Sequence, residues 1–151
     1  MKYLSLLLIL SLALSSCEVD DICTQDVQNP RLVLSFYDLD NPSVKKTANE
    51  LYVWAEAKDS LYKNQNLDSI ALPLDITKNE LIYLIESTHT VDTLHVFYKN
   101  NEVFLSRSCG YIYNFELEET TNLTQHWTSG FEFITDQQIN NETQTHIKVY
   151  H

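Results

Sequence analysis

The sequence predicts an all-β protein, an immunoglobulin-like antiparallel β-sandwich of about nine short strands. Three observations lead to this prediction. Beyond residue 30, apolar residues alternate with polar ones at a period of two, as they do in half-buried strands. Helical periodicity is almost absent. The apolar runs are short and separated by polar turns, and a single sheet could not cover so many apolar faces, so two packed sheets are expected.

The first four runs predict strands with different surroundings. Residues 32–37 and 51–56 alternate in polarity, so each predicts a strand with one buried face. Residues 69–74 include Pro73, which has no N–H for a ladder hydrogen bond and therefore indicates an edge strand or a bulge. Residues 81–85 are apolar on both faces, which predicts a central strand.

The later runs predict a hairpin and three further strands. Residues 94–98 and 103–105 flank Asn100-Asn101, and since Asn tolerates positive φ, this pair predicts a tight turn. The last strand is expected to end inside a sheet at the C-terminus. The remaining strands are predicted at residues 111–117, 131–133 and 147–149. Irregular chain is predicted at residues 18–29, 41–49, 58–68 and 119–129.

The N-terminal residues have the pattern of an export signal. Lys2 precedes an apolar run over residues 4–14, which is too short for a membrane span of about 20 residues. Leu14-Ser15-Ser16-Cys17 resembles the lipobox of bacterial lipoproteins, which implies acyl chains such as palmitate on Cys17. The predicted parts are a signal peptide (1–16), a lipidated linker (17–29) and a β-sandwich domain (30–151). The alternative is ordinary secretion with cleavage near residues 13–15, which leaves Cys17 unmodified.

Charge and glycine content exclude several classes of function. The 151-residue chain has a formal net charge of −11, and removing Lys2 with the leader makes it −12. So acidic a chain is a poor partner for nucleic acid or an anionic membrane face. Only two glycines occur, so glycine-rich phosphate loops and dinucleotide-binding fingerprints are absent. We therefore expect no nucleic-acid partner and no cofactor.

Two cysteines remain when Cys17 is assigned to lipid. Outside the reducing cytosol, the pair Cys23 and Cys109 predicts a disulfide that ties the N-terminal segment to the body of the domain. Two unpaired thiols remain the alternative, because a sequence does not show the distance between them. A metal site is not expected, since no second Cys or His stands at short ligand spacing from either cysteine.

Other candidate chemistry has an ordinary structural interpretation. Residues 38–41 (Asp-Leu-Asp-Asn) offer oxygen ligands for calcium but lack the Gly and distal Glu of a calcium loop, which favours a strand-ending turn. His89 and His95 flank Asp92, yet no nucleophile elbow or metal-binding His motif accompanies them. We therefore predict no catalytic residues.

Several aromatic residues are candidates for stacking on a sugar or a peptide. They are His126-Trp127, the tyrosines of the second and seventh predicted strands, and Trp54, which shares a strand face with Tyr52. Core packing is the favoured interpretation, because aromatic side chains commonly fill strands.

Three positions resemble the Asp-(Ser/Thr)-apolar pattern that carries O-glycans in some envelope proteins. They are Ser60, Ser69 and Thr93. The alternative is simple turn chemistry, because Asp followed by Ser is common before a strand.

Several short motifs occur together: Cys17-x5-Cys23, Pro30-Arg31-Leu32, Phe36-Tyr37-Asp38, Leu72-Pro73-Leu74, Ser106-Arg107-Ser108-Cys109-Gly110-Tyr111 and His146-Ile147-Lys148-Val149-Tyr150. Together they resemble an uncharacterised family of small lipoproteins from the Bacteroidota, a domain-of-unknown-function family. The likeness spans nearly all of the chain after the leader, and it implies no known activity and no catalytic residues. It supports treating Cys23 and Cys109 as a structural pair. The two arginines, Arg31 and Arg107, are expected either to meet a carboxylate such as Asp38 or to be solvated.

These features predict an envelope lipoprotein, anchored by its lipid in the outer membrane and facing the periplasm or the cell surface. Its expected role is a non-catalytic binding or assembly module for an envelope partner, either an outer-membrane β-barrel or other envelope protein, or a glycan. The rival hypothesis is a small hydrolase whose catalytic residues converge from loops, since chain order does not exclude one.

Overall fold

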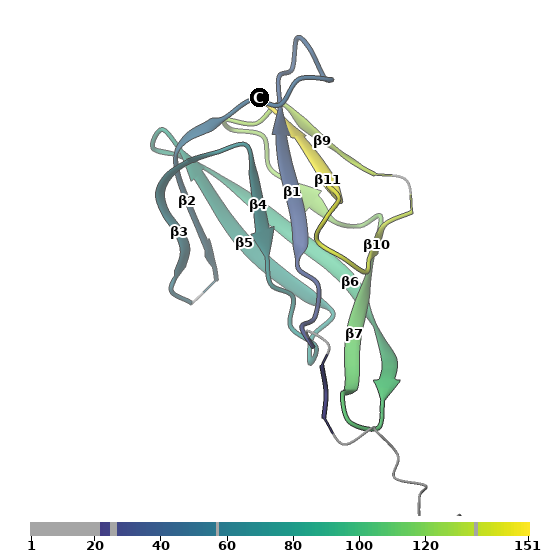
Figure 1. The fold of residues 1–151 in the computed structure, drawn as a ribbon. Helices are drawn as coiled ribbons and strands as arrows, with labels where there is room; N and C mark the ends of the chain where they lie inside the picture. Colours follow the sequence, from purple (N-terminus) through teal and green to yellow (C-terminus); the bar gives the residue numbers. More distant parts are fainter. Residues whose placement is uncertain (1–21, 25–26, 57, 135) are drawn as a thin grey trace, which may run out of the picture.

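The computed structural model of the chain describes residues 22–24, 27–56, 58–134 and 136–151. These residues form two open sheets in a sandwich-like arrangement and no helix, which confirms the all-β prediction (Figure 1). Within this described part, no helix has the length and apolar character needed to cross a membrane.

The smaller sheet has the strand order β4-β1-β11-β9. β1 and β11 run parallel, whereas the other neighbours in this sheet are antiparallel, so the sandwich is not purely antiparallel. The C-terminal strand lies between two partners, as predicted. Its strands are β1 (Leu32–Tyr37), β4 (Ser69–Leu72), β9 (Gly130–Phe133) and β11 (Ile147–Tyr150).

The larger sheet has the order β10-β7-β6-β5-β2-β3, and β8 pairs with β6 beside this path. The strand predicted to be central, β5, lies between β2 and β6. The strands of this sheet are β2 (Ala48–Ala55), β3 (Ser60–Leu67), β5 (Glu80–Ser87), β6 (Thr90–Ser106), β7 (Gly110–Leu117), β8 (Asn122–Leu123) and β10 (Gln138–Ile139).

The core lies between the two sheets and is formed by alternate residues of their strands. β1 shows the pattern clearly, since Leu32, Leu34 and Phe36 are fully buried. The inward face of β6 contributes Leu94, Val96 and Tyr98 in the same way. The period-two alternation in the sequence therefore records which face of each strand meets the other sheet.

The predicted hairpin turn at Asn100-Asn101 is wrong. β6 continues through both residues, which pair with Phe115 and Asn114 of β7. The two-residue turn lies instead at Thr88-His89, between β5 and β6, where φ is 48° and 65°. Two consecutive positive φ values are typical of a type I′ hairpin turn. Pairing with β7 along a long ladder therefore determines the backbone conformation at Asn100-Asn101, despite the weak strand propensity of asparagine.

The part of the chain that the structure describes forms eleven strands, and the largest departure from the prediction is β3. Residues 58–68 were expected to be irregular because they are mostly polar, but β3 occupies Ser60–Leu67. β3 is an edge strand whose side chains are mostly exposed. Because neither face of the strand is buried, its sequence does not need to alternate between apolar and polar residues. β4 also lies at an edge, as Pro73 indicated, and Pro73 follows the strand directly.

One hairpin extends beyond the sandwich. Beyond Phe97, β6 has no strand partner except β7, and residues 99–113 of this hairpin extend the larger sheet past its other strands at the end opposite the C-terminus (Figure 1). We call these residues the arm. None of them is buried. The β2–β3 hairpin and the segment after β4 lie at the same end of the sandwich.

Candidate functional site

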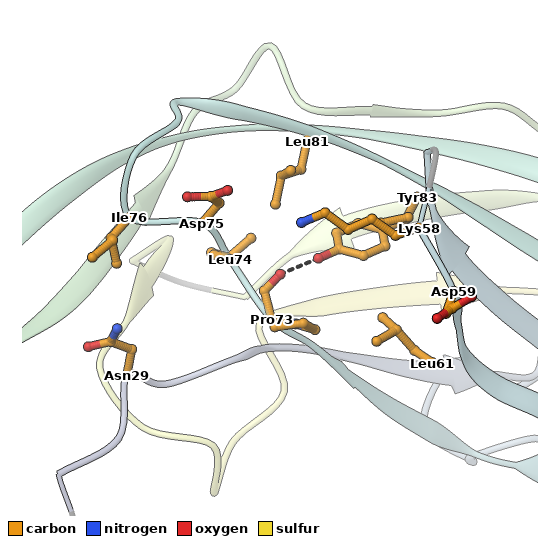
Figure 2. A pocket seen from close by; sticks show the side chains of 11 residues that line it. Asn29, Lys58, Asp59, Leu61, Pro73, Leu74, Asp75, Ile76, Leu81 and Tyr83 are labelled. Atoms are coloured by element: carbon orange, nitrogen blue, oxygen red, sulfur yellow. Dashed lines mark hydrogen bonds between the residues drawn. The ribbon is translucent and has the colours of Figure 1, made fainter.

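An open cavity lies at the end of the sandwich from which the arm projects. It has a volume of about 350 Å³ and lies between the β2–β3 hairpin, the segment after β4 and the beginning of β5 (Figure 2). Its walls are mainly aliphatic and come from Ala55, Leu61, Pro73, Leu74 and Leu81. We call it the main cavity. The size is at the lower end of the range of small-ligand sites, and such sites are usually apolar.

The rim of the main cavity combines exposed apolar and charged side chains. Leu61 is 42% exposed and Ile76 is 41% exposed, which is high for large aliphatic residues. Lys58, Asp59 and Asp75 also line the cavity and bring both signs of charge to it. A cavity of this kind suits a peptide segment. An apolar side chain of the peptide would contact the floor, and its polar backbone would contact the charged groups at the rim.

The irregular wall of the cavity, residues 73–78, is held by side chains from the large sheet. The hydroxyl of Tyr83 donates to the carbonyl of Pro73. The hydroxyl of Tyr98 accepts from the Asp75 N–H at 3.1 Å and donates to the Asp75 carbonyl at 2.9 Å. Asn100 Nδ2 donates to the carbonyls of Ile76 and Lys78 at 2.7 and 3.0 Å. The wall is therefore fixed before any ligand arrives.

The titratable groups of this wall have fixed charge states. The side chain and backbone N–H of Thr77 both donate to the Asp75 carboxylate, which lowers the pKa of Asp75. Burial raises the pKa of both Tyr83 and Tyr98. At neutral pH, Asp75 is thus an anion and both tyrosines are protonated donors. These groups position backbone and offer no acid–base pair poised near pH 7.

Two further hollows adjoin the main cavity. One is lined by Trp54 together with Lys58, Asp59 and Leu61, so an indole ring borders the rim. The other, of about 410 Å³, shares Ala55, Lys58 and Leu81 with the main cavity and extends to polar residues of β5 and β6. There His95 Nε2 lies 3.2 Å from a Glu80 carboxylate oxygen. Hollows lined by aromatic and polar side chains therefore continue along this end of the sheet.

A second polar cluster surrounds Asp92, whose side chain is fully buried. Oδ1 accepts hydrogen bonds from Thr124 Oγ1, the His126 N–H and His126 Nδ1 at 2.7–2.9 Å. Oδ2 accepts from the N–H groups of Trp127 and Thr128 and from Thr128 Oγ1 at 2.9–3.2 Å. Burial alone would raise the pKa of Asp92, but these hydrogen bonds outweigh it and lower the pKa.

The Asp92–His126 contact has the geometry of a catalytic dyad, yet its surroundings give it a structural role. Every acceptor position of Asp92 is used to hold the loop 124–128 against β6. Trp127 packs against Phe36 and His151, and its indole N–H donates to the Ile85 carbonyl. In the described chain, no serine or cysteine side chain is bonded to His126. The sequence did not predict this loop anchor, because its partners lie more than 30 residues away.

The predicted disulfide is present in the structure. Cys23 and Cys109 are bonded, at a separation of 86 positions in sequence. The bond joins the N-terminal segment to the tip of the arm, and Asn29 Oδ1 accepts from the Tyr113 N–H at 2.8 Å in support. The predicted lipidation site, Cys17, lies outside the described residues, as does the predicted signal peptide at residues 1–16.

The three candidate O-glycan acceptors lie apart from one another and none is fully exposed. Ser60 begins β3, and Ser69 begins β4 and donates to Asp68. Thr93 lies within β6, directly after the buried Asp92. Glycosylation stays a prediction, to be tested by intact mass in hexose steps.

The described residues hold no group of three or more His, Cys, Asp or Glu that fits a metal ion. Residues 38–41 form the turn after β1 that the sequence favoured, with the Asp40 N–H donating to Asp38 Oδ1 at 2.9 Å.

Arg31 does not pair with Asp38. It binds Glu142 through two parallel hydrogen bonds of 2.9 and 2.6 Å, joining the N-terminal segment to a distant loop.

The sequence did not predict the main cavity. The two signals that point to it are Leu61, an apolar residue in a mostly polar strand, and Pro73, which directly follows β4. Neither becomes informative until the fold brings β3, β4 and β5 to one end of the sandwich (Figure 2).

Comparison with curated proteins gives no match, and comparison with solved structures gives none either. Comparison with protein families gives one result. The model of a family of unknown function, DUF6452, matches residues 50–151, which include every strand from β3 to β11 and most of β2. Since the match covers more than half of the chain, the protein belongs to this family of unknown function.

Proposed function

We propose that this protein is a non-catalytic binding or assembly module of the cell envelope that holds a partner protein in the main cavity. The observation that carries the proposal is the cavity itself. Its wall is fixed by Tyr83, Tyr98 and Asn100, its floor is aliphatic, and its rim exposes Leu61 and Ile76. A preformed apolar hollow lowers the entropy cost of binding, because little needs to be ordered when the partner arrives.

The envelope location is proposed from the N-terminal sequence. Leu14-Ser15-Ser16-Cys17 after an apolar run supports lipidation of Cys17, and the likeness to small lipoproteins of the Bacteroidota supports the same assignment. The disulfide fits an oxidising compartment. We propose that acyl chains anchor the protein in the outer membrane, on its periplasmic or outer side.

A protein partner is favoured over a glycan by the chemistry of the lining. Leu61, Leu74 and Leu81 offer aliphatic contacts, which suit an apolar side chain better than a hydroxylated sugar. Trp54 borders the adjacent hollow and is the residue on which a sugar would stack. An outer-membrane β-barrel or another envelope protein is therefore the proposed partner, and glycan binding is an outcome of the test.

The test places a photo-cross-linking amino acid at position 61 in cells that make the full chain. Leu39 is 50% exposed and lies in the turn after β1, at the opposite end of the sandwich, so position 39 is the matched control. We expect a discrete envelope protein to be captured from position 61 and not from position 39. The same capture should fall strongly when Ile76→Glu places a charge at the rim.

Two results would contradict the proposal. Equal capture from positions 61 and 39 would show that the cavity is not the binding surface. Loss of glycan retention in Trp54→Ala, without protein capture at position 61, would assign the site to a sugar instead.

A further inference from the structure

The tip of the arm carries an aromatic pair that no other part of the described protein covers. Phe104 of β6 and Tyr111 of β7 lie opposite each other in register, and their ring centroids are 5.1 Å apart. Each residue is 56% exposed. Such large apolar side chains are seldom left in water at a hairpin tip unless they contact something.

The arm has no core of its own that would explain its length. None of residues 99–113 is buried, and an isolated two-stranded hairpin is only marginally stable in water. At its base, Asn100 is hydrogen-bonded to the segment after β4, and nearer its tip the support comes from the N-terminal segment, through the Cys23–Cys109 disulfide and the hydrogen bond from the Tyr113 N–H to Asn29. The structure thus fixes this arm to the N-terminal segment.

The same connection limits the distance between the arm and the proposed lipid anchor. Cys17 precedes Cys23 by six residues, and six residues of extended chain span at most about 21 Å. Ile22, beside Cys23, is 78% exposed and adds an apolar side chain at this tip. An acyl chain on Cys17 would therefore hold the arm close to the bilayer surface.

Charge also distinguishes the arm from the rest of the chain. Residues 99–113 hold two cations, Lys99 and Arg107, and one carboxylate, Glu102, whereas the whole chain has a net charge of −11. The arm itself is therefore less acidic than the rest of the chain, with Lys99 lying 3.7 Å from Glu118 at its base, while Glu18, Asp20 and Asp21 stand between Cys17 and Cys23.

We propose that the arm is a membrane-contacting element whose Phe104 and Tyr111 rings enter the boundary between lipid headgroups and acyl chains. Aromatic rings favour this boundary because it is apolar on one side and wet on the other. The inference rests on the proposed lipid anchor at Cys17. It places the C-terminal end of the sandwich away from the membrane and the main cavity on the membrane-facing side.

The experiment attaches the anchor chemically, so that it does not depend on lipidation in the cell. The chain from Cys17 to His151 is coupled through the Cys17 thiol to a maleimide phospholipid, since the other two cysteines are disulfide-bonded. Phe104→Trp reports contact with vesicles of phosphatidylcholine and phosphatidylglycerol. We expect its emission to shift to the blue and to be quenched when the acyl chains are brominated.

Leu39→Trp is the matched control, because Leu39 is similarly exposed but lies at the opposite end of the sandwich. The coupled wild type gives the background from Trp54 and Trp127. Tyr111→Trp is a second reporter in case the first variant folds poorly. Equal quenching at positions 104 and 39 would overturn the proposal, even if the mass of the cellular protein shows lipidation.

A second measurement separates lipid from protein as the occupant. A photo-cross-linker at position 104 in cells should attach to lipid. Capture of one discrete protein there would overturn the membrane contact in favour of a protein interface. Absence of lipid on Cys17 in the cellular protein would instead count against the proposed anchor and leave the vesicle result as a property of the arm.

Discussion

At the scale of single residues, two carboxylates show how environment decides what a charge contributes. Asp92 is fully buried and accepts six hydrogen bonds from the loop 124–128. Glu142 forms a bidentate pair with Arg31, but the side chains of the pair are 32% and 50% exposed. Water screens the Arg31–Glu142 ion pair but not the buried Asp92, so the two carboxylates should make very different contributions to the free energy of unfolding.

We expect Asp92→Asn to lower the free energy of unfolding by about 3 kcal/mol. The substitution keeps the side-chain volume, but its amide nitrogen faces donors and leaves several buried groups of the loop unpaired. Urea unfolding followed by intrinsic fluorescence measures the change. Glu142→Gln is the control, and its cost should stay below about 1 kcal/mol. Equal losses in the two variants would contradict this assignment.

The contribution of Asp92 should also depend on pH. Its pKa is lower in the folded protein than its ordinary value of 3.8, so the folded state binds the proton less readily than the unfolded state does. The stability that Asp92 adds is therefore complete above that ordinary pKa and is lost as the pH falls below it, through the folded pKa. The difference in unfolding free energy between wild type and Asp92→Asn should shrink over this range. A difference that stays constant would rule out the ionised carboxylate as its source.

At the scale of elements, the irregular segment 73–78 behaves as part of the large sheet because three side chains of β5 and β6 hold its backbone. Tyr98 is the most deeply involved, since its hydroxyl bonds both the N–H and the carbonyl of Asp75. At the neighbouring edge, the Tyr62 hydroxyl accepts from the Ala71 N–H at 2.9 Å and so occupies a free donor of β4. Side-chain hydroxyls thus replace missing ladder partners at this end of the sandwich.

We expect Tyr98→Phe to loosen the cavity wall more than it destabilises the protein. Loss of the two hydrogen bonds should cost about 1–2 kcal/mol. Amide hydrogen exchange at Asp75 should accelerate, while exchange at buried β5 positions such as Ile85 follows only the global change. Tyr52→Phe, which removes a hydroxyl from the outer face of the same sheet, serves as the control. Unchanged exchange at Asp75 would show that the wall does not depend on Tyr98.

The elements also show which parts of the fold the sequence predicted. β1 has its predicted bounds, and β5 is central as expected. Burial of one or both faces of a strand leaves a mark in the sequence, because the buried positions are occupied by apolar residues. β3 leaves no such mark, since it lies at an exposed edge. The turn at Asn100-Asn101 was predicted from local propensity, but pairing with β7 decides the conformation there. The main cavity and the Asp92 loop depend on contacts between distant segments, which no local pattern records.

At the scale of the whole molecule, the protein divides into a packed sandwich and an arm without buried residues. The sandwich is stabilised by the core between its sheets. The arm is held at its base by Asn100, and toward its tip by the Cys23–Cys109 bond and the hydrogen bond between Asn29 and Tyr113. Loss of the disulfide should therefore affect these two parts unequally.

We expect the double variant Cys23→Ser, Cys109→Ser to keep the sandwich and to release the N-terminal segment from the arm. Closing a loop of 86 residues is worth about 4.6 kcal/mol through the unfolded chain. The measured loss should be smaller, because the segment around Ile22 and Cys23 can detach in the folded variant and regain its own freedom. Hydrogen exchange separates the two effects. The Tyr113 N–H should exchange much faster than in wild type, whereas amides of β1 and β5 change only with global stability. Equal acceleration at all these sites would mean that the disulfide supports the core itself, and the arm would then be part of the folding unit rather than an appendage held for contact.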